Sequence, residues 1–187
     1  MKNNKDYIDF KPIQLTTPEN SRLTYGWLVK ADDKYPPARW QVTVVVPASE
    51  EATNLVIQLD DYNKNFKRAL KQAYTIRFPD LNEEQIVEKL KALKWNPLPW
   101  SVKDHDELGL KDALILRCNK KTHDDQGTPK APPIIFDSSQ KEPLNDEQKQ
   151  KYEKIGPGTT GQVALYVSQY NLGVGTGIRL TPAAVNI

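Results

Sequence analysis

The sequence lacks several features that mark particular protein classes. It has one cysteine, Cys118, in 187 residues, so an internal disulfide is impossible and nothing favours an oxidising compartment. No apolar run approaches the roughly 18 residues that span a membrane, and the first residues lack the apolar core of a signal peptide. We therefore expect a cytosolic protein, in which Cys118 is a small buried hydrophobe within an apolar strand.

Signals for a metal site are also missing. The sequence has two histidines, and each lies among acidic residues: His105 in the segment DHDE, and His123 directly before Asp124 and Asp125. Neither spacing matches a convergent set of metal ligands. We expect solvated loops at both places and no metal, and no local arrangement of Ser, His and Asp or of Cys and His predicts an enzyme.

The glycine-rich segments do not match nucleotide-binding motifs. In GPGTTGQ at 156–162, Gln and Val follow the last glycine, where a phosphate loop requires Lys and then Ser or Thr. The glycines at 173, 175 and 177 lie between two strand patterns, so no helix N-terminus is available to bind a pyrophosphate. We expect no cofactor, and we assign these glycines to turns and a bulge.

Alternating polar and apolar residues predict most of the chain to be β-structure. The net charge of +2 is too small to indicate a nucleic-acid partner by itself, so the positions of the basic residues must decide. Strands are expected at 22–31, 39–46, 113–121, 134–136, 162–168 and 175–184. In the first, the pattern places Leu23, Tyr25, Trp27 and Val29 on one side.

A helical block is expected between the second and third strands. Ser49 is a suitable N-cap for an amphipathic helix reaching about Tyr74, and Asn82 with Gln85 forms a capping box for a shorter helix. We expect this block, 49–94, to be a helical cap. The remaining segments are predicted as an extended N-terminal arm at 1–20, an ordered loop with two tryptophans at 95–112, and a helical turn after Asn145. A five-stranded antiparallel barrel with this cap is the simplest arrangement, and a sandwich is the alternative.

One side of the predicted sheet combines cations with tyrosines. In the strand at 162–168, Val163, Leu165 and Val167 point to the core, which leaves Tyr166, Ser168 and Tyr170 on the other side. The same rule adds Arg39, Gln41, Thr43, Arg117, Asn119, Lys121, Arg179 and Thr181 to that side and places Trp40 in the core. Cations beside exposed rings suit single-stranded nucleic acid, because the cations follow phosphates and the rings stack on bases. A solvated sheet surface is the alternative.

Several segments in this order resemble a known family. ARWQVTVVVP followed by a long helix, then LILRCNKK, IIFD and GPGTTGQVALYVSQYNLGVGTGIRL, is similar to the single-stranded DNA-binding proteins of bacteriophage replication systems. The resemblance covers about residues 22–187 and implies a single OB-fold domain over 1–187. It also implies backbone contact or stacking at Arg39, at Lys120 or Lys121, and at Tyr166 and Tyr170.

The chain departs from that family in two respects. Members usually end in an acidic tail that binds replication proteins, whereas this sequence ends in PAAVNI. Either a tail has been removed or partners are recruited differently. The second helix is an addition to the simplest barrel.

The sequence thus predicts a non-enzymatic protein that binds single-stranded DNA without sequence preference. It would protect and organise single strands during phage replication or recombination, in the cytoplasm of the host bacterium. Phosphates would be neutralised by Arg39, Arg117, Lys120, Lys121 and Arg179, and bases would stack on Tyr166 and Tyr170, with Trp27 or Trp40 as further candidates, although alternation favours the core for Trp40. Replication proteins such as a polymerase or helicase-primase, and further copies of the chain, are candidate partners. Two alternatives remain open: a phage structural or adaptor protein whose barrel binds another protein, and a nuclease, which would need converging carboxylates.

Overall fold

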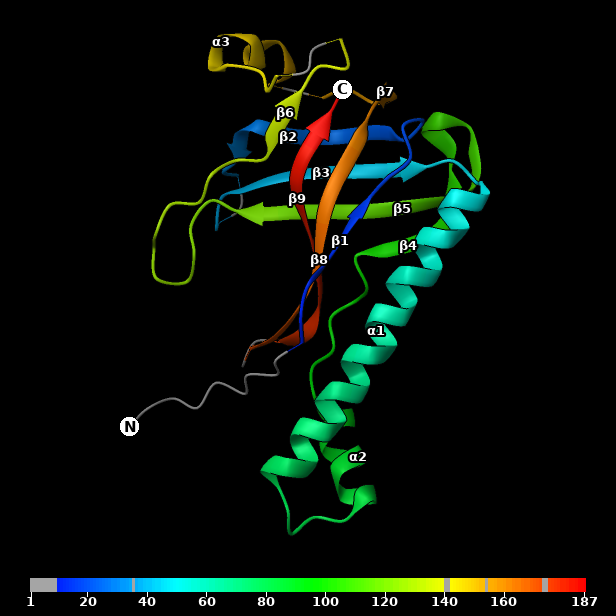
Figure 1. Cartoon of the computed structure of the whole chain (residues 1–187), viewed down its shortest axis with the longest axis vertical. Coiled ribbons are helices and arrows are strands. Elements are labelled where there is room, and N and C mark those ends of the chain that lie inside the picture. The colour runs from blue at the N-terminus through cyan, green and yellow to red at the C-terminus, as the bar shows by residue number, and fades with distance from the viewer. Residues whose placement is uncertain (1–9, 35, 140–141, 154, 173–174) are drawn as a thin grey trace.

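The computed structural model describes residues 10–34, 36–139, 142–153, 155–172 and 175–187. Nine strands and three α-helices occur in the described chain (Figure 1). The strands are β1 Ile13–Thr16, β2 Arg22–Asp32, β3 Arg39–Val46, β4 Trp100–His105, β5 Leu110–Lys121, β6 Ile134–Phe136, β7 Thr159–Thr160, β8 Gln162–Leu172 and β9 Gly175–Asn186. The helices are α1 Glu50–Arg77, α2 Glu83–Lys91 and α3 Asp146–Lys149, with 3₁₀ turns η1 Asp106–Leu108 and η2 Gln150–Tyr152.

The strands form one mixed sheet in the order β1-β8-β9-β5-β3-β2-β7, with β4 added beside β5 and β6 beside β9. The pairs β5·β9 and β6·β9 are parallel and the other pairs are antiparallel. In Figure 1, β8 and β9 run across the direction of β3 and β5. The prediction of a mainly β protein with a helical block is confirmed, but the five-stranded antiparallel barrel is wrong because the sheet is larger, mixed and not closed.

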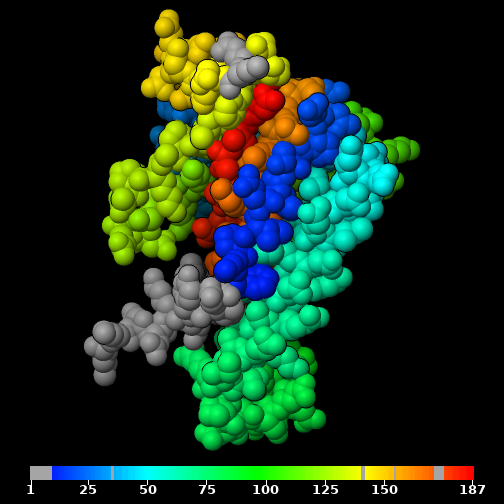
Figure 2. All heavy atoms as spheres, in the orientation of Figure 1, coloured from blue at the N-terminus to red at the C-terminus, as the bar shows by residue number. Residues whose placement is uncertain are grey.

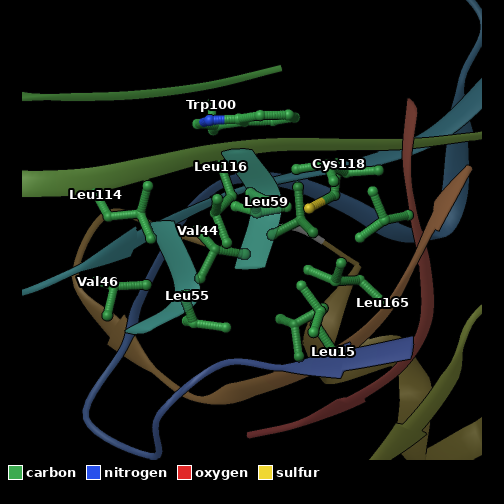
Figure 3. Packing of buried hydrophobic residues seen from close by; sticks show 14 of the residues in the cluster. Leu15, Val44, Val46, Leu55, Leu59, Trp100, Leu114, Leu116, Cys118 and Leu165 are labelled. Carbon is green, nitrogen blue, oxygen red and sulfur yellow. The ribbon is translucent and has the colours of Figure 1, made fainter. Parts of the chain in front are cut away.

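The core lies between the bent sheet and α1. Leu55 and Leu59 of α1 face Val44, Leu116 and their neighbours in Figure 3. Trp40 is 8% exposed, as predicted for a core residue. Cys118 is 2% exposed, and burial raises the pKa of its thiol to about 12, so it packs as the expected small hydrophobe.

The helical block begins where its capping residues predict. The Ser49 side chain accepts a hydrogen bond from the Ala52 backbone N–H, and Asn82 forms a reciprocal capping box with Gln85. The block lies between β3 and β4, and α1 extends to Arg77, past the predicted end. The C-terminal half of α1 extends past the sheet and lies beside α2, so the two helices project beyond the strands (Figures 1 and 2).

Besides the two-residue β7, which pairs with β2, two short strands lie in segments predicted to have no sheet pairing. Within the arm 1–20, β1 pairs with β8 and buries Leu15. Within the loop 95–112, β4 pairs with β5, and buried Trp100 donates its indole N–H to Asp60 of α1 at 3.1 Å. Both strands hold few residues, so alternation gave too little signal to distinguish them from ordered loop.

The segment that follows β5 and the C-terminal strands β8 and β9 agree with the prediction more closely. The 3-residue strand β6 is present, and Asn145 caps the helical turn after it. Val163, Leu165 and Val167 of β8 are buried as expected. The predicted turn at Gly173 lies outside the described residues.

β2 contains a bulge that reverses the predicted sides of its second half. The register against β3 shifts between Thr24 and Trp27, and Tyr25 has a φ of 50°. Consequently Tyr25 is 62% exposed instead of sharing the buried side of Leu23, and Leu28 is buried in the core together with Leu23. No helix in the described part of the chain is long and apolar enough to cross a membrane.

Candidate nucleic-acid interface

The candidate site is built on the paired strands β3 and β5. Val42 pairs with Cys118, and both are buried. The pairs on either side of them, Gln41 with Asn119 and Thr43 with Arg117, therefore face away from the core. Arg39 and Lys121 form the last pair of the series. We call this series of outward-facing pairs the ladder side.

The hairpin β8–β9 brings an aromatic ring beside the ladder side. Tyr170 pairs with Gly177, and a Cβ on Gly177 would lie 2.9 Å from the tyrosine hydroxyl, so only glycine lets the ring cover this position. Asn96 donates a hydrogen bond to the Tyr170 hydroxyl at 2.9 Å. The guanidinium carbon of Arg179 lies 5.3 Å from the centre of the same ring, a cation–π contact.

Three adjoining hollows run along this surface and together form what we call the groove. The basic hollow, of about 200 Å³, is lined by Arg39, Asn119, Lys121, Tyr170 and Arg179, with Pro99 and Ile178. The central hollow, of about 300 Å³, shares Asn119 with it and adds Gln41, Thr43, Arg117 and Tyr25. The acidic hollow, of about 400 Å³, shares Tyr25, Thr43 and Arg117 with the central one and is lined beyond them by Asp104, Asp106 and Glu107, with Lys103 and His105.

The two ends of the groove therefore differ in charge. Four cations, Arg39, Arg117, Lys121 and Arg179, line the basic and central hollows. Lys121 forms an ion pair with Asp125 at 3.0 Å, and Arg39 donates to the Pro37 carbonyl at 3.3 Å. Because an exposed ion pair contributes little free energy, a phosphate can replace Asp125 as the partner of Lys121.

Five of the seven predicted site residues line the groove: Arg39, Arg117, Lys121, Tyr170 and Arg179. The structure does not bring Lys120 to this surface. Lys120 pairs with Trp40 on the opposite side of the strands, and partial burial, followed by the charge of Lys130, lowers its pKa. Tyr166 is 44% exposed but lies further along β8, paired with Gln14 and Thr181, and it lines none of the three hollows.

The most prominent groove residue that the sequence did not identify is Tyr25. Simple alternation assigned it to the side of Leu23, because a bulge is invisible to a period-two pattern. The dipeptide Tyr-Gly at 25–26 was the available signal, since glycine inside a strand often marks a bulge. Trp27, past the bulge, pairs with Gln41 at the edge of the groove and is partly buried.

The acidic segment also differs from its prediction. His105 ends β4 instead of lying in a loop, and Asp106 begins the η1 turn. Within the described chain, no three His, Cys, Asp or Glu side chains converge in a way that could hold a metal ion. His123 lies in a loop, as expected.

Solved structures share this architecture. The chain superposes on gp2.5, a single-stranded DNA-binding protein encoded by bacteriophage T7, with a TM-score of 0.59 and 16% identity, over 95% of this chain and 86% of that one. It also superposes on a C-terminal truncation of the single-stranded DNA-binding protein from bacteriophage Enc34, with a TM-score of 0.60 and 14% identity, over 94% and 83% of the two chains.

The fold is that of phage single-stranded DNA-binding proteins. The resemblance noted in the sequence is thereby confirmed at the level of fold. The Enc34 protein in complex with single-stranded DNA gives a TM-score of 0.51 at 15% identity, over 94% of this chain and 84% of that one. No protein-family model and no curated protein matches the chain in sequence.

Proposed function

We propose that this protein binds single-stranded DNA in the groove, largely without sequence preference, and that it protects and organises single strands during phage DNA replication or recombination in the host cytoplasm. The observation that carries the proposal is the combination of four cations and the Tyr170 ring along one sheet surface. The fold supports it, because a phage protein of the same fold has been solved in complex with single-stranded DNA.

The cations would act on the phosphates. Arg39, Lys121 and Arg179 surround the basic hollow, and Arg117 continues the series into the central one. Each phosphate that they neutralise releases counterions, at about 0.7 per contact on a single strand. If all four make such contacts, the logarithm of affinity should fall with the logarithm of salt concentration with a slope of about −3.

Tyr170 would supply base stacking. Asn96 donates a hydrogen bond to its hydroxyl, and the Arg179 guanidinium makes a cation–π contact with its ring. The ring is therefore held in place before DNA binds. Every base offers a flat face to such a ring, and stacking is therefore tolerant of sequence. Binding, not bond cleavage, is the chemistry that this surface supports.

The proposal is tested by titrating the protein with oligo(dT) while following tryptophan fluorescence at a low and a high salt concentration. We expect saturable binding at low salt that weakens steeply at high salt, and similar affinities for mixed-sequence oligonucleotides. Absence of binding at low salt would show that the proposal is wrong.

A second candidate function is that of a phage structural or adaptor protein. A mainly apolar hollow of about 310 Å³ between α1 and α2, lined by Leu70, Val87, Leu90 and Trp95, favours a protein partner, among which replication proteins or another copy of the chain are candidates. This function predicts a stable complex with another protein and no salt-dependent affinity for DNA. The oligo(dT) titration therefore separates the two functions.

A further inference from the structure

Tyr25 has a backbone conformation that a bulky residue rarely adopts. Its φ of 50° lies in the left-handed region, which costs free energy for a side chain with a Cβ. Its side chain is 62% exposed, so core packing gives no reason for a tyrosine at this position. Strained residues of this kind cluster where a side chain must be held for function.

The neighbouring backbone fixes the bulge. Gly26 and Ile155 exchange two backbone hydrogen bonds, of 3.5 and 3.3 Å. A Cβ on Gly26 would lie 2.8 Å from the Ile155 Cβ, so the strand is seated tightly against residue 155. This contact directs the preceding side chain, Tyr25, away from the core.

The Tyr25 side chain stands between two hollows of the groove. Tyr25, Thr43 and Arg117 line both the central and the acidic hollow. The Tyr25 hydroxyl donates a hydrogen bond to Glu107 of η1 at 2.9 Å, and this bond raises the pKa of Tyr25. This hydrogen bond links β2 to η1 on the groove surface.

Charge changes at the same point. The central hollow presents Arg117, which also borders the acidic hollow, and the neutral side chains of Gln41 and Asn119. The acidic hollow adds three carboxylates, those of Asp104, Asp106 and Glu107, and one further cation, Lys103, so negative charge predominates there. A phosphodiester is attracted by the first set and repelled by the second.

We propose that Tyr25 is a base-stacking residue that ends the DNA track, so that a strand lying on the basic and central hollows places a base against this ring and leaves the surface before the carboxylates. The proposal rests on the DNA-binding function proposed above. It gives the groove two stacking positions, Tyr170 in the basic hollow and Tyr25 at the border of the acidic hollow. Between these two rings the DNA strand follows the four cations.

The test compares Tyr25→Gly with Tyr25→Phe. Glycine adopts a φ of 50° without steric cost, so Tyr25→Gly removes the ring while the bulge is retained. Tyr25→Phe keeps the ring and removes only the hydroxyl. Binding of oligo(dT) is measured over a series of salt concentrations, with thermal unfolding of each variant as a check on folding.

We expect Tyr25→Gly to weaken binding about 5- to 150-fold, the range for one lost stacking contact, with an unchanged salt slope because no phosphate contact is lost. Tyr25→Phe should bind within about threefold of the original protein, since the stacking surface remains. Equal affinity of Tyr25→Gly and the original protein would overturn this inference while leaving the proposed function in place. Failure of the original protein to bind oligo(dT) would overturn both.

Discussion

The two sides of the β3–β5 pairing have opposite roles, although they are built from alternate residues of the same strands. On the core side, Val42 and Cys118 are buried under α1 and the hairpin. On the ladder side, one residue away, Asn119 and Arg117 line the groove. Folding and the proposed DNA binding therefore depend on separate sets of side chains, so substitutions should separate the two properties.

The ladder side is not polar along its whole length. Towards β4, Val45 and Ile115 are buried with Ala113 in a second, smaller cluster, against which Leu108 and Leu110 pack. The segment around η1 therefore covers the sheet there and ends the open surface. The groove occupies only the uncovered part of the ladder side.

The largest expected effect is on the core side. Leu116, 1% exposed and central in Figure 3, should cost about 2–5 kcal/mol of unfolding free energy when changed to alanine, because the loss of buried methyl groups leaves a cavity. Chemical denaturation measures this loss. The neighbouring Arg117→Ala, whose side chain is exposed, is the matched control and should change stability by less than about 0.5 kcal/mol. A similar loss in both variants would contradict the division between the two sides.

The next largest effect distinguishes the two tyrosines of β8. Tyr170→Ala should weaken oligo(dT) binding by about 1–3 kcal/mol, because one stacking surface is lost. Tyr166→Ala should weaken it much less, since Tyr166 lies outside the groove. Equal losses would support the sequence-based prediction that both rings stack, and unfolding of Tyr170→Ala would mean that its ring is structural.

A smaller effect distinguishes two cations of β5. Arg117→Ala should weaken binding about tenfold, or ~1.4 kcal/mol, and reduce the salt slope by about 0.7. Lys120→Ala, on the opposite side of the strand, should leave the slope unchanged. Salt-dependent titrations of the two variants measure this difference, and a reduced slope for Lys120→Ala would place DNA on both sides of β5.

The smallest effect concerns the acidic end. Glu107→Gln removes one negative charge from the border of the track but keeps an oxygen that can accept the Tyr25 hydrogen bond. Because exposed charges interact by only ~1 kcal/mol or less in water, we expect binding about two- to threefold tighter at low salt. The gain should disappear at high salt, where such repulsion is screened. Weaker binding of this variant would mean that the carboxylate contacts the strand favourably.

Local signals in the sequence predicted the elements whose formation depends on neighbouring residues. Ser49 and Asn82 located the helix starts, and alternation located β3, β5 and the hairpin strands. Features that depend on distant pairing were missed. Nothing near Ile13 shows that it pairs with Val167, and nothing in the loop around Trp100 shows that it pairs with Leu116.

The candidate site shows the same difference between local signals and distant pairing. Arg39, Arg117 and Lys121 could be assigned to one surface because a single uninterrupted register relates them. Tyr25 could not be assigned to this surface, because its exposure depends on a bulge. The bulge is held by backbone hydrogen bonds between Gly26 and Ile155, which is far along the chain. Tyr166 was grouped with Tyr170 because alternation shows only which side of a strand a residue faces. It does not show where along the strand the sheet bends away from the groove.

The central claim is that single-stranded DNA lies along the groove of the ladder side. Chemical-shift mapping by NMR during titration with oligo(dT) tests it most directly. We expect the largest shifts on residues of the basic and central hollows, including Arg39, Asn119 and Tyr170, with little change in α2. Shifts concentrated on α2 or on the side of Lys120, with the groove unaffected, would contradict it.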